Sequence, residues 1–396
     1  MSDPALLGRT AARLRNVAGF IAFELDRYQQ LTTVEPADDF GFPTTSLTPL
    51  ALCRLPRSDA YAEDVKAIST RVGVPATAVA NFLRAVDAIA ALSSRRNMTF
   101  EERPSKIGTL VAARDHSDER TSFEEPTGGE PVLPAWLGKA VDRFWGGEQA
   151  PATFPRDLQL PVLLNLPVAI VEIENLTVAS LDQWLRRHQL PALAAMAERH
   201  LRGCLTAYAG LGIIFVDRSD DADQRRLTLA HEVGHFIVDY LLPREDVARR
   251  RPQLLEVLDG DREATDAERF DALLADAPIG FHTHLLERDL HGGHLSNVAA
   301  EVEDRAERLA LELLAPLESV LAALPHAAGP PTASDWQLLL REQFGLPAGA
   351  AMRYANHVQR FRPRSPSGLL DAIGLTERSD DILGSERHDD EQEPEP

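Results

Sequence analysis

The sequence has little cysteine, and its two cysteines lie far apart. Cys53 and Cys204 form no CxxC pattern, which excludes a disulfide framework and a cysteine-based zinc site. Long apolar runs are also missing: no stretch of about 18 uninterrupted apolar residues occurs, and the N-terminus lacks the basic and apolar regions of a secretory signal. We therefore expect a soluble, cytoplasmic protein with no membrane segment.

Lysine is scarce as well, with three among the 41 basic residues, whereas acidic residues number 61. The formal net charge is −20, and −7 of it falls in the last twenty residues, where nine acids face two arginines. This composition predicts an acidic, disordered tail over residues 363–396. The body of the chain is acidic too and is a poor match for a phosphate backbone, so direct nucleic-acid binding would require a small basic patch.

The remaining composition is that of a folded protein. Hydrophobic residues make up 44% and charged residues 26% of the 396 residues, and this length predicts roughly two or three domains. A stretch rich in Pro, Gly and charge marks the main boundary, so we expect a helical N-terminal domain over 1–125 and a linker over 126–155. A second domain is expected over 156–325, followed by a helical C-terminal region over 326–362.

Residues 61–91 have the spacing of a helix-turn-helix, because two helical stretches flank Gly73-Val74-Pro75. The second helix of a DNA reader is basic and polar. Residues 76–91 offer Arg84 as their only cation and are otherwise largely apolar. The pattern favours a helical hairpin packed in a core, and a DNA reader is the alternative.

Beyond the linker, residues 162–174 and 201–217 carry β-branched runs and glycine turns, which predict strands of a small sheet. A helical segment, residues 181–200, lies between them. The order helix, strand, helix, strand, helix indicates an α+β fold that is mainly helical, and it argues against a wound parallel sheet.

The clearest chemical signal is an HExxH motif that follows the second predicted strand. His231 and His235 lie four residues apart, so on a helix both imidazoles point toward one spot and can bind one Zn²⁺ while Glu232 flanks it. Thr228 is in position to cap this helix, and the small Gly234 between the ligands would permit close packing. Two surface histidines or a structural ion pair are the alternative explanations.

A zinc site for hydrolysis needs a third protein ligand and an open position for water. Glu303 is the candidate because it lies in a strongly helical segment, and Glu307, one turn later, projects from the same face. Glu307 could accept a hydrogen bond from the far nitrogen of a ligand histidine. Both carboxylates could instead be solvated helix residues. The competing ligands are a histidine cluster and one acid on the helical face of the motif: His282, His284, His291, His294 and Asp239.

Two runs around these candidates match the pattern of a known family. RRLTLA before HEVGH is similar to RRFTLAHELGH, and AERLALELLAP is similar to EANxFAAELLMP, both typical of the ImmA/IrrE family of intracellular metallopeptidases. The resemblance covers residues 160–325 and implies a zincin-like, mini-gluzincin fold in which His231, His235 and Glu303 hold the metal. It also implies a protein substrate, a helix-turn-helix repressor whose cleavage switches on genes of a mobile element or a stress response.

The chain departs from the family pattern in two ways. The family usually has Asn or Asp at the position of Glu307, and the 67 residues between the second motif histidine and Glu303 are more than the family has. The extra residues predict an insertion over 242–298 that could cover the cleft. It should contain one or two helices, with a capping box formed by Thr265 and Glu268.

Residue chemistry and resemblance together predict a cytoplasmic zinc metallo-endopeptidase that acts in transcription regulation. His231, His235 and Glu303 would hold Zn²⁺, with Mn²⁺ as the alternative ion, and Glu232 would serve as general base and then as general acid. The rival hypothesis is a metal-binding regulatory or interaction module, or a DNA-binding regulator, with little or no peptidase turnover.

Overall fold

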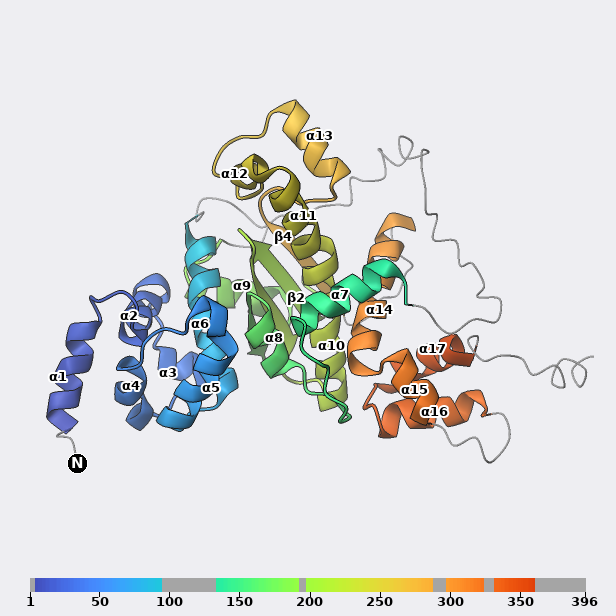
Figure 1. Cartoon of the computed structure of the whole chain (residues 1–396), viewed down its shortest axis with the longest axis horizontal. Coiled ribbons are helices and arrows are strands. Elements are labelled where there is room, and N and C mark those ends of the chain that lie inside the picture. The colour runs from blue at the N-terminus through green and yellow to red at the C-terminus, as the bar shows by residue number, and fades with distance from the viewer. Residues whose placement is uncertain (1–3, 95–132, 192–196, 288–296, 324–330, 360–396) are drawn as a thin grey trace, which may run out of the picture.

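Figure 1 shows the computed structural model of the chain, which describes residues 4–94, 133–191, 197–287, 297–323 and 331–359. The described part is mainly helical with one small sheet near its centre, in agreement with the predicted α+β class. The predicted tail over 363–396 and two members of the histidine cluster, His291 and His294, lie outside the described residues.

The sheet has four strands in the order β1-β3-β2-β4. Strand β3 is parallel to β1 and antiparallel to β2, and β4 pairs antiparallel with the other side of β2. The strands are β1 (Val168–Ile173), β2 (Leu201–Tyr208), β3 (Leu211–Asp217) and β4 (His282–Glu287).

Residues 201–217, predicted to be extended, form a hairpin of strands β2 and β3. Its two turn residues, Ala209 and Gly210, both have positive φ, which suits the twist of a two-residue hairpin. The strand predicted over 162–174 begins only at Val168, because its first residues belong to helix α8 (Gln159–Asn165).

The N-terminal region is all helical in its described part, as predicted. Its elements are α1 (Pro4–Leu14), α2 (Ile21–Thr32), α3 (Pro36–Phe40), α4 (Thr44–Ala51), η1 (Ser58–Ala60), α5 (Tyr61–Val72) and α6 (Ala76–Ser93). Helices α5 and α6 meet at Gly73, where a φ of 73° ends α5.

The α5–α6 pair is a hairpin packed in the core. The Arg84 guanidinium lies 4.1 Å from the centre of the Tyr61 ring and donates hydrogen bonds to the carbonyls of Leu163 and Leu164 at 3.1 and 3.3 Å. Arg84, the only cation in residues 76–91, is therefore engaged in contacts within the protein and not presented to DNA.

Helix α6 covers the sheet as well as its own neighbours. Nine of its residues are buried, and the Asn81 side chain exchanges hydrogen bonds of 2.7 and 2.8 Å with the backbone of Ile170 in edge strand β1. By length and composition alone, this helix could cross a membrane. Its burial against β1 and β3 assigns it to the protein core.

One continuous core extends from the N-terminal helices through the sheet to the C-terminal helices. The described helices of the region expected to form the N-terminal domain over 1–125 share this core with the sheet. The contact is made mainly through α6, whose buried apolar residues pack against β1 and β3.

A buried polar network joins the N-terminal helices to α9 (Val178–Arg187). Asp39 accepts a hydrogen bond of 2.6 Å from the Tyr28 hydroxyl, and its Oδ2 lies 2.8 Å from Nε2 of His188, just after α9. Tyr28 and His188 are almost fully buried. Burial opposes ionisation of Asp39, but the bonds from His188 and Tyr28 outweigh it and hold the pKa of Asp39 below its usual range.

Two helices cover opposite faces of the sheet (Figure 1). Helix α10 (Ala222–His235) packs against β2 and β3, where Gly203 of β2 lies under its side chains. Phe215 of β3 points to the other face and meets Trp184 of α9 at a ring distance of 5.0 Å. Helix α14 (Asn297–Leu314) then packs along α10.

The predicted insertion contains helices and a strand. Helices α11 (Leu242–Arg250), η5 (Pro252–Leu254), α12 (Leu255–Leu258) and α13 (Asp266–Leu274) surround a small core of their own at one end of the molecule (Figure 1). The capping box of Thr265 and Glu268 is present at α13, as predicted. The first part of the histidine cluster forms strand β4, which pairs with the edge of β2 that β3 leaves open.

The linker and the C-terminal region add the remaining helices. Residues 135–145 of the linker form α7 (Ala135–Trp145), and the C-terminal helices are α15 (Leu317–Ala323), α16 (Ala333–Glu342) and α17 (Ala348–Val358). Phe344, between α16 and α17, is fully buried and packs against Phe154 with a distance of 4.5 Å between ring centroids. The predicted helical character of 326–362 is confirmed for its described part.

Candidate metal centre

Helix α10 carries the HExxH motif. Asp221 caps it by accepting a hydrogen bond of 2.8 Å from the backbone N–H of Gln224. The helix thus begins earlier than expected: Thr228 is a buried residue within it, not its cap. His231 and His235 are one turn apart, and their Nε2 atoms lie 3.1 Å from each other.

Gly234 allows helix α14 to approach α10 closely. A Cβ at this position would lie 2.8 Å from the carbonyl oxygen of Ala306 and 2.9 Å from its Cα, which is far too close for any side chain. This contact brings the first half of α14, and with it Glu303, over the motif. The packing role expected for Gly234 is confirmed.

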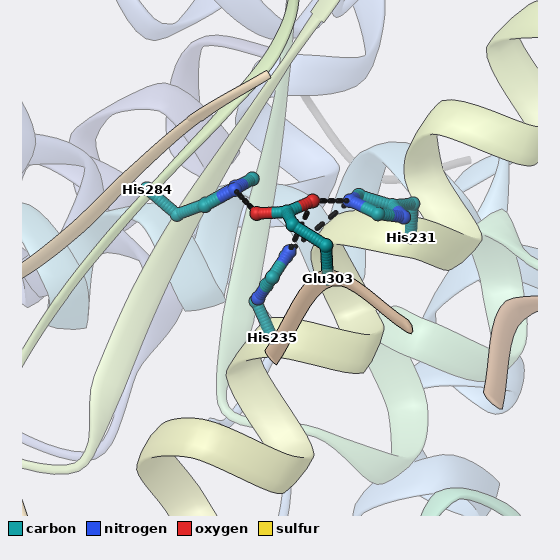
Figure 2. Close-up of side chains that lie close together, drawn as sticks. All are labelled: His231, His235, His284 and Glu303. Atoms are coloured by element: carbon teal, nitrogen blue, oxygen red, sulfur yellow. Dashed lines mark hydrogen bonds and ion pairs between the residues drawn. The ribbon is translucent and has the colours of Figure 1, made fainter. Parts of the chain in front are cut away.

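Glu303 meets both motif histidines through one carboxylate oxygen (Figure 2). Its Oε2 atom lies 3.2 Å from Nε2 of His231 and 3.7 Å from Nε2 of His235. His235 is almost fully buried, whereas His231 and Glu303 are partly exposed, so solvent reaches the cluster from their side. The structure therefore brings together the three ligands predicted from the sequence.

His284, from edge strand β4, completes the cluster. Its Nε2 lies 2.9 Å from Oε1 of Glu303, and its Nδ1 lies 3.0 Å from Oε2 of Glu232. Its ring stacks on that of His235 at 3.6 Å. The ligand atoms of His231, His235, His284 and Glu303 all lie within 4.8 Å of one another, so this group could hold a metal ion.

Asp239, not Glu307, orients a ligand histidine. Oδ2 of Asp239 lies 2.8 Å from Nδ1 of His235, and Arg305 of α14 donates a hydrogen bond of 3.0 Å to Oδ1 of Asp239. A proton on Nδ1 leaves the Nε2 lone pair of His235 free to face the cluster. Asp239 lies in the π-helical turn η4 (Phe236–Leu241) that continues α10.

Glu307, which was expected to orient a ligand histidine, pairs with an arginine in the structure. Its carboxylate accepts hydrogen bonds of 2.6 and 3.1 Å from the Arg353 guanidinium of α17. The pair links the C-terminal helices to the helix that carries Glu303. Glu307 therefore links α14 to α17 through its ion pair with Arg353.

The acid–base state of the cluster follows from its burial and its carboxylates. Burial lowers the pKa of His231 below its ordinary value. Burial also acts on His284, but the charge and hydrogen bonds of Glu232 and Glu303 outweigh it and raise the pKa of His284 to about 10. Burial opposes ionisation of Glu303, yet the bonds from three histidines hold its pKa well below its usual range. The carboxylates of Glu232 and Glu303 thus favour the protonated form of His284.

Glu232 is fully buried between α10 and the sheet. A Cβ on Gly203 of β2 would lie 2.9 Å from Oε1 of Glu232 and 2.7 Å from Cγ2 of Thr228, so a glycine is required beneath the motif. Oε1 of Glu232 has no hydrogen-bond partner among the described residues. A buried carboxylate oxygen without a hydrogen-bond partner costs free energy. This oxygen therefore indicates that a molecule bound in the functional site donates a hydrogen bond to Glu232.

The sequence named His284 among the competing ligands but gave no reason to select it. His282 and His284 alternate along a strand and so share a face, and only His284 reaches the cluster. The His282 ring instead lies 5.7 Å from that of Tyr240. The alternation His-Thr-His in FHTH was the available signal for a strand.

Comparison of the chain with protein-family models, with curated proteins and with solved structures finds no match for any part of it. The geometry of the cluster is therefore the basis on which a function can be assigned.

Proposed function

We propose that this protein is a cytoplasmic zinc-dependent metallo-endopeptidase. The observation that carries the proposal is the convergence of Nε2 of His231, Nε2 of His235 and Oε2 of Glu303, with Glu232 beside them. Their separations of 3.1, 3.2 and 3.7 Å suit tetrahedral Zn²⁺, whose ligands at 2.0–2.1 Å lie about 3.3 Å apart. Mn²⁺ is the alternative ion.

Zinc held by these three residues would lower the pKa of water and polarise the carbonyl of a peptide bond. Glu232 would serve as the base. Its carboxylate would take a proton from water as the water oxygen adds to the carbonyl carbon, and it would return the proton to the amine nitrogen as the C–N bond breaks. Asp239 holds His235 in the tautomer that this arrangement needs.

The substrate class comes from the family resemblance. The resemblance of the RRLTLAHEVGH and AERLALELLAP runs to the ImmA/IrrE family supports a helix-turn-helix repressor as substrate. Cleavage of such a repressor would relieve repression of a mobile element or of stress-response genes.

A second candidate function has one observation in its favour. Catalytic zinc sites have three protein ligands and an open position, whereas closed sites have four. His284 lies close enough to the other three residues to make a fourth ligand. The rival function is therefore a metal-binding regulatory module in which a closed site supports the structure and turnover is absent.

Substitution of Glu232 by glutamine tests the proposal. Glu232→Gln should keep about one zinc per chain and lose hydrolysis, because an amide cannot accept the proton while the imidazoles stay in place. The measurements are metal content and cleavage of a repressor encoded beside this protein, with and without chelator. Glu307→Gln, which changes a carboxylate outside the cluster, is the matched control and should cleave normally. Wild-type cleavage by Glu232→Gln would refute the role of Glu232, and a zinc-loaded wild type without cleavage would favour the rival function.

A further inference from the structure

We propose that His284 is a positioning residue that ties the base Glu232 to the metal ligand Glu303. The inference rests on the proposed function, since it assigns a role within the same site. Its basis is the bridge formed by one imidazole, with Nδ1 at 3.0 Å from Oε2 of Glu232 and Nε2 at 2.9 Å from Oε1 of Glu303.

The two oxygens of Glu303 face different partners. Oε2 faces the motif histidines, and Oε1 faces His284 (Figure 2). A carboxylate held in this way presents a single oxygen to a metal, because the other oxygen is engaged in a hydrogen bond. Metal-binding carboxylates commonly have such outer partners. The bridge therefore favours three protein ligands and an open position over a closed site.

Both ring nitrogens of His284 are engaged with carboxylates. Direct ligation of a metal by His284 would require one of these hydrogen bonds to break, which would leave either Glu232 or Glu303 without its partner. Breaking the bond to Glu232 is the costlier of the two, because the Glu232 side chain is fully buried and Oε1 already lacks a partner among the described residues.

The orientation of Glu232 depends on this bridge. In the described part of the chain, the bond from His284 is the one hydrogen bond to the Glu232 side chain. From the other side the carboxylate is confined by β2, where Gly203 leaves just enough room. His284 itself sits on a paired strand, in register with Leu205 of β2. A base whose carboxylate is held by two neighbouring strands in this way is preorganised for proton transfer.

The test uses the full-length protein and three variants of β4. His284→Ala removes both bonds, and His284→Asn keeps a polar side chain that can donate to one carboxylate only. His282→Ala is the matched control, because it removes the same side chain from the same face of the same strand. Circular dichroism and thermal melting establish that each variant is folded.

Three readouts are compared. Zinc affinity is measured by competition with a chromophoric chelator, and the ligand set is read from the visible absorption of the Co²⁺-substituted protein. Peptide cleavage is measured as kcat and KM. His284→Ala should bind zinc about 10- to 100-fold more weakly, keep the Co²⁺ bands in position, and lose kcat with little change in KM. His284→Asn should fall between His284→Ala and wild type, and His282→Ala should match wild type.

Two results would overturn the assignment. A shift or collapse of the Co²⁺ bands in His284→Ala would make His284 a direct ligand, and wild-type zinc affinity with wild-type kcat would leave it without a role. The proposed function fails separately, if zinc-loaded wild type cleaves no peptide or repressor. In that case zinc affinity and the Co²⁺ spectrum still decide whether His284 anchors Glu303.

Discussion

Replacement of Gly234 by alanine should damage the metal site without touching any ligand. The added Cβ would lie 2.8 and 2.9 Å from backbone atoms of Ala306, where ordinary contacts begin at 3.4 Å. Because the contact is with backbone, no side chain can swing away, and α14 must move by about 0.5 Å relative to α10. Glu303 lies on α14 one turn before Ala306, so it moves as well.

The magnitude follows from two opposing effects. Overpacking of a close helix contact costs about 1–3 kcal/mol, whereas glycine to alanine in a helix stabilises by about 0.5–1 kcal/mol. The free energy of unfolding of the Gly234→Ala variant should therefore fall by about 1–2 kcal/mol. Ligand distances must hold to about 0.2 Å, so zinc affinity should fall about ten-fold or more.

Urea unfolding in chelator and a zinc competition titration measure the two effects separately. Gly138→Ala in α7 is the matched control, because its Cβ would meet nothing within 4 Å. That variant should gain about 0.5–1 kcal/mol of unfolding free energy and bind zinc normally. If Gly234→Ala were as stable as Gly138→Ala and bound zinc as tightly as wild type, the argument from the α10–α14 contact would be refuted.

Three further predictions concern single carboxylates. Glu303→Ala should lose its zinc on dialysis while Glu307→Ala retains it, because Glu307 lies outside the cluster; equal retention would contradict the ligand assignment. Asp39→Ala should lower the free energy of unfolding by about 2–4 kcal/mol at pH 7, because it leaves the buried Tyr28 hydroxyl and Nε2 of the buried His188 without a partner; urea unfolding measures this. Because the pKa of Asp39 is held below its unfolded value, its contribution is present above that value and is lost as the pH falls through the folded pKa. The difference between wild type and Asp39→Ala should therefore shrink as the pH falls below about 4, and a difference that stays constant with pH would refute an ionised Asp39.

The sequence by itself determined the parts of the site that depend on local geometry. A spacing of four residues places His231 and His235 on one helical face whatever surrounds the helix. The capping box of Thr265 and Glu268 likewise involves atoms three residues apart, and it forms as predicted. Glu303 was reached by a different route, since its selection over other acids came from the resemblance to a family, not from spacing.

The sequence could not decide whether Asp239 or Glu307 orients a histidine of the motif. Each lies four residues after a metal-ligand candidate, so helical periodicity treats them alike. Tertiary packing separates them, because Arg353 of α17 pairs with Glu307, whereas Asp239 faces into the α10–α14 contact and meets His235 and Arg305. Side-chain partners of this kind are set by which helices pack together.

Strand pairing and helix docking determined the position of His284 and the packing of α6. His284 enters the cluster because β4 adds to β2 in the register that pairs His284 with Leu205, and a shift of one residue would point the imidazole to the other face of the sheet. The apolar side of α6 likewise has the same pattern whether it packs on another helix or on a sheet, and only docking against β1 made it part of the core that includes the sheet. Periodicity fixes which residues share a face, but contacts between distant segments fix what that face meets.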